Sequence, residues 1–363
     1  MRVLFAESEY PYMHGSFLET AVRAAVAAGV DVHVWSANAK SEHPYPLVAP
    51  LHTNEPLSAT IDRVRPDIVH SHYLDLAARL KAEVASRGVL YTVRMHGCDY
   101  QQALLNRMAA DPAIAHIFVF PHYADDVDPA NREKVSVLPT MYNPQFYGLE
   151  PGRTRETDSK LVLRGVAGSD RKNIAHFLEA AALCPGYRFV LIMGCAYPVN
   201  RPPVAGIEAL NERMGRPVEI RKNLDWPAMA ALMRRAAMYM YTPPNHPSGM
   251  SISVAESMAC GCLVLGPDIR GMEAYLGESG GRVYRNPAEA AEIVRSTAAW
   301  SEADWRRTAE RSSAYAKRHY AMNVVGPKLV AAWRKLIGEA EPAPRRGVAK
   351  LWRRITSRRL ERV

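Results

Sequence analysis

The densest group of residues suited to chemistry lies in residues 245–265, where the sequence reads NHPSGMSISVAESMACGCLVL. An apolar run ends near Tyr241, and a helical pattern begins near Ser253 with Glu256 in its first turn. The loop between them carries Ser248, Gly249, Met250 and Ser251. Backbone N–H groups at a helix start attract anions, and a glycine lets a ligand approach the backbone closely. The segment therefore predicts an anion site beside a carboxylate.

A second interpretation of Glu256 is structural. Glu256 follows Ser253 by three residues, which is the spacing of a capping box, in which the two side chains satisfy N–H groups at a helix start. From the residues alone, the ligand-binding and the capping interpretations both stay open.

The elements that must position this segment alternate between strands and helices. In the first half, strands are predicted at 2–6, 31–35, 67–70, 89–93, 117–120 and 135–137. A helix with a Ser16–Glu19 capping box is predicted to end at Gly29, and a second helix covers 74–84. A chain of this kind predicts parallel strands joined by crossover helices.

A polar segment at 150–159 interrupts the pattern, which then restarts. Strands are predicted at 160–164, 187–192, 218–220 and 238–241, helices at 173–183 and 226–237, and a helical region from 302 to 337. Two such series predict an α/β fold of two Rossmann-like, doubly wound sheets facing each other across a cleft, where ligands bind at the carboxyl ends of the strands. We expect units at 1–155 and 156–340 and a basic tail at 341–363.

Charge and cysteine content limit the functional classes. The net charge is +9, but residues 345–363 hold eight basic residues and one acid, a net charge of +7, which leaves +2 for the rest. The body is therefore not a general binder of polyanions, and we expect no nucleic-acid partner. Five scattered cysteines indicate a reducing compartment. The sequence contains no run of 18 apolar residues, so we expect no membrane-spanning helix. We expect a cytoplasmic protein.

Residues 247–265 resemble the nucleotide-sugar site of retaining glycosyltransferases with the GT-B fold, especially glycosyltransferase family 4. That family has a Glu, seven residues, a second Glu, and then Ala-Met-Ala-x-Gly-x-Pro-Val. The sequence ESMACGCLV from Glu256 is similar to the second half of this pattern. The resemblance implies that Glu256 binds the ribose hydroxyls of the donor. The first family Glu falls at Ser248, which lacks the charge that this carboxylate brings to the donor sugar.

The resemblance continues through the first half. The opening loop implies that Gly15 and Ser16 lie near the donor diphosphate. The sequence TVRMHGCD at 92–99 is similar to a family motif whose histidine lies near the transferred sugar, which implies that role for His96. The alternative for His96 is a histidine at a strand end that is satisfied by the backbone.

The loop GVAGSDRKNI at 165–174 is similar to a family loop in which Arg and Lys neutralise the diphosphate. Lys172 fits the Lys, and Arg171 substitutes for the Arg; the alternative is a solvated basic loop. Gly194 and Asn223 would border the nucleotide. We expect neither a metal nor a cofactor, and these cations would stabilise the leaving diphosphate.

Together these features predict a glycosyltransferase that moves a sugar, with retention, from a nucleotide sugar to a glycan or lipid-linked acceptor in cell-surface polysaccharide or glycolipid synthesis. A nucleotide-sugar epimerase of the same fold and a non-catalytic sugar-nucleotide-binding protein are the alternatives. A Rossmann dehydrogenase is disfavoured because no G-x-G-x-x-G opens the first helix. The basic tail, with Trp352, predicts adsorption to an anionic membrane surface; a solvated tail is its alternative.

Overall fold

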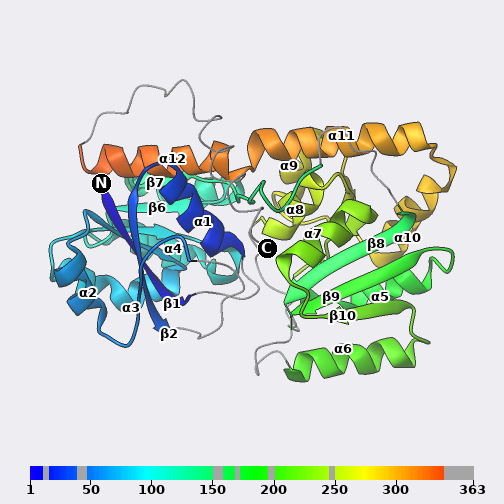
Figure 1. Cartoon of the computed structure of the whole chain (residues 1–363), viewed down its shortest axis with the longest axis horizontal. Helices are drawn as coiled ribbons and strands as arrows, with labels where there is room; N and C mark the ends of the chain where they lie inside the picture. Colours follow the sequence, from blue (N-terminus) through cyan, green and yellow to red (C-terminus); the bar gives the residue numbers. More distant parts are fainter. Residues whose placement is uncertain are drawn as a thin grey trace, which may run out of the picture.

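The computed structural model of the chain describes residues 1–10, 16–38, 47–149, 158–167, 172–194, 201–244 and 250–338. These residues form two wholly parallel β-sheets, each covered by helices on both faces and lying side by side in the molecule (Figure 1). The predicted fold class is confirmed.

The first sheet has the strand order β3-β2-β1-β4-β5-β6-β7. Alternate residues of a strand point to opposite faces. Val3 and Phe5 accordingly pack with helices α1 and α12 (Met322–Leu336), whereas Leu4 and Ala6 pack with α2, α3 and α4. The strands are β1 (Arg2–Glu9), β2 (Asp31–Asn38), β3 (Leu51–His52), β4 (Ile68–His72), β5 (Leu90–Arg94), β6 (His116–Val119) and β7 (Val135–Val137), and the helices are α1 (Ser16–Ala27), α2 (Leu57–Val64), α3 (Leu74–Ala85) and α4 (Gln102–Ala110).

The second sheet has the order β10-β9-β8-β11-β12-β13, so its strand order reverses between β8 and β11. Helices α5, α6 and α10 pack on one face, and α7, α8 and α9 on the other. The strands are β8 (Asp158–Ala167), β9 (Arg188–Gly194), β10 (Val218–Lys222), β11 (Ala236–Met240), β12 (Leu263–Pro267) and β13 (Arg282–Tyr284), and the helices are α5 (Ala175–Ala182), α6 (Arg201–Arg213), α7 (Trp226–Arg235), α8 (Ile252–Ala259), α9 (Met272–Leu276) and α10 (Pro287–Ser296).

The helical region expected from 302 to 337 consists of two helices, α11 (Glu302–His319) and α12 (Met322–Leu336). The two helices are separate because the backbone between them pairs with Tyr142. The Tyr142 N–H donates to Tyr320 O at 2.8 Å, and the Tyr142 carbonyl accepts from Met322 N at 2.9 Å. After this bridge α12 crosses to the first sheet and packs against α1 (Figure 1). The expected unit boundaries at 155 and 340 stay predictions.

The contact between α1 and α12 depends on Gly326. A Cβ atom added there would lie 2.7 Å from the Cβ of Ala24, so only a glycine lets the two helices approach this closely. The α12 helix is thereby held on the first sheet.

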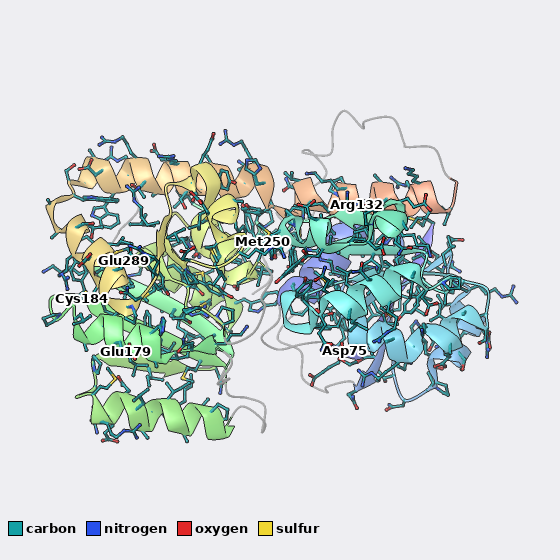
Figure 2. All side chains as sticks on the ribbon, turned by 180° about the vertical axis from the view of Figure 1, so that it is seen from behind. Asp75, Arg132, Glu179, Cys184, Met250 and Glu289 are labelled. Carbon is teal, nitrogen blue, oxygen red and sulfur yellow. The ribbon has the colours of Figure 1, made fainter. Side chains whose placement is uncertain are left out.

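Cys184, Cys260 and Cys262 are buried. Cys184 lies on the side of the second sheet away from the first, whereas Met250 lies where the two halves meet (Figure 2). In the described part of the chain, no helix is long and apolar enough to cross a membrane. The basic tail lies outside the described residues.

Candidate active site

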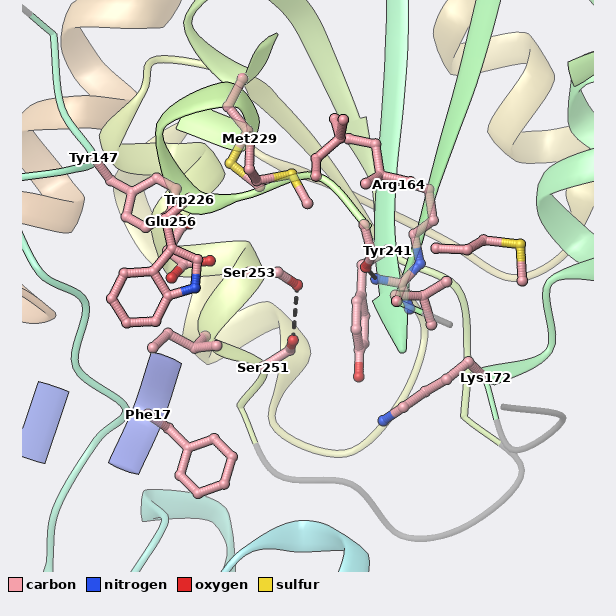
Figure 3. Close-up of a pocket in the computed structure, with 18 of the residues that line it drawn as sticks. Phe17, Tyr147, Arg164, Lys172, Trp226, Met229, Tyr241, Ser251, Ser253 and Glu256 are labelled. Carbon is pink, nitrogen blue, oxygen red and sulfur yellow. Dashed lines mark hydrogen bonds between the residues drawn. The ribbon is translucent and has the colours of Figure 1, made fainter. Parts of the chain in front are cut away.

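A cavity of about 260 Å³ lies at the carboxyl ends of β8, β9 and β11 (Figure 3), beside the point between β8 and β11 where the strand order of the second sheet reverses. Open α/β sheets bind their ligands at this point. The side chains that line the cavity come from both halves of the chain. They include Phe17, Tyr73 and Tyr147 from before the polar segment and Arg164, Lys172, Asn223, Trp226, Tyr241 and Glu256 from after it.

Glu256 lies in the second turn of α8 with only 4% of its surface exposed, and it lines the cavity. The N-cap of α8 is Ser251, so Ser253 and Glu256 do not occupy the N-cap and N3 positions of a capping box. The capping interpretation of Glu256 is therefore wrong. Its role as a ligand of the donor ribose stays a prediction, and its place in the cavity wall is compatible with that role.

Two cations stand at another part of the cavity wall. Arg164, at the carboxyl end of β8, is 1% exposed, and its guanidinium carbon lies 4.5 Å from the ring centroid of Tyr241. Its Nε donates to Thr242 Oγ1 at 3.2 Å, and Thr242 Oγ1 donates to the Lys172 carbonyl at 2.6 Å. The side chain of Lys172 extends into the same space in Figure 3. Thr242 thus links the two cations.

Arg164 is also linked to the start of α8. Its Nη1 donates to Tyr239 Oη at 3.1 Å, and Tyr239 Oη donates to Ser253 Oγ at 2.8 Å. Ser253 Oγ lies 2.9 Å from Ser251 Oγ, a bond drawn in Figure 3. A continuous set of hydrogen bonds therefore fixes the basic wall relative to the helix that carries Glu256.

Among the described residues, three of the six non-glycine residues with positive φ lie at the cavity or next to it. Tyr73 and Asn223, which line it, and Asn173, next to Lys172, have φ values of 73°, 53° and 42°. Asparagine tolerates this left-handed region, but a tyrosine there is strained and persists only where the surrounding structure holds it. The Tyr73 N–H donates to Arg94 O at 2.8 Å. Strain of this kind is common at binding sites and adds weight to the cavity as the functional site.

His96 does not line this cavity. Its ring packs against Phe17 and Tyr73, with centroid distances of 4.6 and 4.8 Å, and both of these residues line the cavity. Burial, together with His72, Arg94 and His70, holds the pKa of His96 well below its ordinary value, so its ring is neutral. The predicted contact between His96 and the transferred sugar stays a prediction.

The other predicted residues fall into two groups. Gly194 and Asn223 line the cavity, and the Asn223 N–H donates to Met193 O at 2.9 Å. Ser251 also lines it, and Met250 is buried beside α8. Gly15, Arg171, Ser248 and Gly249 lie outside the described residues, as does the side chain of Ser16.

The sequence analysis missed Arg164, Tyr241 and the aromatic wall of Phe17, Tyr73 and Tyr147. A signal for Arg164 was present: a charged residue follows LVL directly in a strand that is otherwise apolar and precedes a glycine. The aromatic residues carried no comparable signal, because they come from three separate segments that only the fold brings together.

An ion pair joins the two halves of the chain. Arg270, just before α9, donates to both carboxylate oxygens of Asp126, at 2.6 and 3.0 Å, and Asp126 ends the 3₁₀ helix Pro121–Asp126. The Tyr100 hydroxyl also donates to Asp126, at 2.5 Å. A Cβ at Gly271, where φ is 83°, would lie 2.6 Å from the His122 ring. The two halves are therefore in close contact here.

In the described part of the chain, no group of three or more His, Cys, Asp or Glu side chains is placed to hold a metal ion. Residues 171–327 match the model of a family described as glycosyl transferase-like. No curated protein matches the chain in sequence.

Solved structures share the fold over most of both chains. HepE of Anabaena, in complex with UDP and glucose, has a TM-score of 0.75 at 14% identity, covering 92% of this chain and 100% of its own. Sucrose-phosphate synthase of Thermosynechococcus elongatus has a TM-score of 0.74 at 14% identity, covering 93% and 100%. A glycosyltransferase of Rickettsia africae has a TM-score of 0.69 at 11% identity, covering 93% and 99%.

The fold of the two units is therefore the GT-B fold, and with the family match it defines the class: the chain is a glycosyltransferase. The matched region contains all the predicted donor residues that line the cavity: Lys172, Gly194, Asn223, Ser251 and Glu256. Within that class, membership of glycosyltransferase family 4 stays a prediction.

Proposed function

We propose that this glycosyltransferase takes a glycosyl group from a nucleoside-diphosphate sugar bound in the cavity and transfers it to a hydroxyl of a glycan or lipid-linked acceptor. One observation carries the proposal: the cavity wall holds a buried carboxylate, Glu256, and two cations, Arg164 and Lys172. A nucleoside-diphosphate sugar has the complementary groups, ribose hydroxyls for the carboxylate and a diphosphate for the cations.

The rest of the lining suits the same ligand. Trp226, Leu224 and Met229 offer an apolar surface for a base, next to the amide of Asn223. The similarity to HepE supports this proposal, because HepE has been crystallised with UDP and with UDP-glucose. The aromatic residues of the first half, Phe17 and Tyr73, would face the acceptor side.

In the proposed reaction, the bond between the anomeric carbon and the phosphate oxygen breaks, and its electron pair stays on the diphosphate. A bond forms between the anomeric carbon and the acceptor oxygen on the same face of the sugar, and the proton of the acceptor hydroxyl passes to the leaving phosphate oxygen. Retention follows without a protein nucleophile. Arg164 and Lys172 stabilise the charge that grows on the diphosphate, which is where fixed cations lower a barrier most.

The basic tail at 345–363 favours an acceptor that lies at a membrane surface. Its charge of +7 would attract an anionic membrane surface, and we propose that it holds the enzyme on the cytoplasmic leaflet near a lipid-linked acceptor of cell-surface polysaccharide or glycolipid synthesis.

The proposal is tested by isothermal titration of the full chain with UDP, GDP and ADP, followed by product analysis with the corresponding nucleotide sugars. We expect one nucleoside diphosphate to bind preferentially, and its sugar conjugates to yield an α- or β-glycoside of unchanged anomeric configuration when acceptor is added. A C2-inverted sugar formed without acceptor would identify an epimerase instead, and tight binding with no turnover would identify a binding protein. Absence of binding at millimolar nucleotide would refute the site itself.

A further inference from the structure

A row of polar side chains is buried on the face of the first sheet that packs against α1 and α12. In the pairing of β4 with β5, His70 lies opposite Thr92 and His72 opposite Arg94, so these four side chains share one face. His96 follows two residues after Arg94. A buried polar row in an otherwise apolar core requires partners for each of its atoms.

Some of these partners are present. His72 Nδ1 lies 2.8 Å from Glu7 Oε1. Trp333 Nε1, from α12, donates to Thr92 Oγ1 at 3.2 Å, and Thr92 Oγ1 lies 2.9 Å from His70 Nδ1. Because Thr92 accepts from Trp333, its own proton can go to His70 Nδ1, which is nearer than the Val69 carbonyl at 3.5 Å. The neutral His70 ring then carries its proton on Nε2.

Three buried nitrogen atoms of this row have no hydrogen-bond partner in the described structure: Arg94 Nη1, His70 Nε2 and His96 Nε2. All three belong to residues that line one small cavity of about 20 Å³. The remaining lining is mostly apolar, with Phe17, Ala21, Leu138, Met141 and Leu329 beside Thr140 and His72. This space is sufficient for about one particle of the size of a water molecule.

The charge of the cavity comes from Arg94, which is 4% exposed. Its Nη2 donates to Pro139 O at 3.1 Å and its guanidinium lies 4.7 Å from the Phe120 ring centroid, but no carboxylate pairs with it among the described residues. Burial lowers the pKa of Arg94 to about 9, so it remains a cation at neutral pH. Burial also holds the pKa of His70 well below its ordinary value. A buried cation without a counter-ion is costly.

We propose that this cavity is a binding site for a single monatomic anion of the size of chloride, held by Arg94, His70 and His96. A water molecule has the right size, but it brings two protons that need acceptors and leaves the Arg94 charge uncompensated. A halide accepts from all three nitrogen atoms and neutralises that charge. The site is separate from the donor cavity, although Phe17 lines both.

The bound anion positions His96. With its Nε2 fixed on the anion, the imidazole ring is held in place against Phe17 and Tyr73 on the wall of the donor cavity. The proposal does not depend on the proposed function, because anion binding can be measured without nucleotide or acceptor.

The direct test is a crystal of the full chain grown in sodium bromide, with anomalous diffraction recorded at the bromine edge. We expect a bromide peak between Arg94, His70 and His96. A cavity that holds a water molecule or nothing at several hundred millimolar bromide would overturn the proposal, whatever the behaviour of any variant.

The second test uses thermal unfolding in sodium chloride against sodium gluconate at equal ionic strength. Above the dissociation constant, each tenfold rise in chloride should raise the Tm of the wild type by about 2 °C. Arg94→Met should remove this dependence, whereas Arg87→Met, at an exposed arginine paired with Asp62, should keep it. An equal chloride effect in wild type and Arg94→Met would also overturn the proposal.

Discussion

The assignment of Glu256 to the donor ribose can be tested by replacing it with glutamine. At 4% exposure the side chain is buried, so Glu256→Ala would also leave empty space in the core, whereas Glu256→Gln keeps the volume and replaces the charged carboxylate with a neutral amide. A hydrogen bond to a charged group contributes roughly 1.5–3 kcal/mol and a neutral one about 0.5–1.5 kcal/mol. For two ribose hydroxyls, Glu256→Gln should therefore lose about 2–3 kcal/mol of binding free energy, which weakens nucleotide affinity by roughly 30- to 150-fold.

The assay is isothermal titration with the preferred nucleoside diphosphate and with its 2′-deoxy analogue. The wild type should bind the ribonucleotide more tightly, and Glu256→Gln should lose most of this discrimination, because the partner of the 2′-hydroxyl has changed. The two ligands and two proteins form a double-mutant cycle, which isolates the contact from any general effect on the fold.

Glu289→Gln is the matched control, since Glu289 lies on α10 away from the cavity and pairs with Arg285 (Figure 2). It should bind both ligands as the wild type does. Wild-type affinity in Glu256→Gln, or unchanged discrimination between ribose and deoxyribose, would refute the assignment of Glu256 to the ribose.

Three further predictions concern other parts of the chain. Lys172→Ala should lower turnover more than Arg171→Ala in steady-state assays, because Lys172 lines the cavity; equal losses would contradict this ranking. Gly326→Ala should lower the free energy of unfolding by about 1–3 kcal/mol, whereas Gly206→Ala in the open face of α6 should not. Removal of residues 341–363 should abolish salt-sensitive co-sedimentation with phosphatidylglycerol vesicles yet preserve transfer to a soluble acceptor; equal pelleting of both proteins would leave the tail a solvated extension.

The strands were the most predictable part of the fold. Parallel strands buried on both faces are nearly continuous apolar runs, and LVL at 161–163 or FVLI at 189–192 can be recognised from composition alone. The strands β3, β12 and β13 and the helices α2, α4, α6, α9 and α10 were not predicted. The short or mixed segments among them carry little periodic signal. The packing of α12 on the first sheet could not be predicted either, because an apolar face on a helix does not indicate which sheet covers it.

The start of α8 shows how resemblance and geometry contribute differently. The pattern around Glu256 identified the residue, but the residues alone also permitted a capping box, and only the register of the helix decided against it. A shift of two residues in the N-cap, from Ser253 to Ser251, moves Glu256 from the first turn into the second, where its side chain borders the cavity.

The role of Arg164 could not be predicted from the spacing of residues in the sequence. A charged residue at the end of an apolar strand is common, and its position in the chain does not say whether it points to solvent or to a site. Its meaning comes from residues more than 70 positions away: the Tyr241 ring beside the guanidinium, the Thr242 hydroxyl that joins it to Lys172, and the Tyr239 hydroxyl that joins it to α8. The order β8-β11 in the sheet brings these groups together, because these two strands pair directly although they are far apart in sequence. The basic wall of the cavity is therefore a consequence of the crossover topology, which explains why local motifs located the carboxylate but not this arginine.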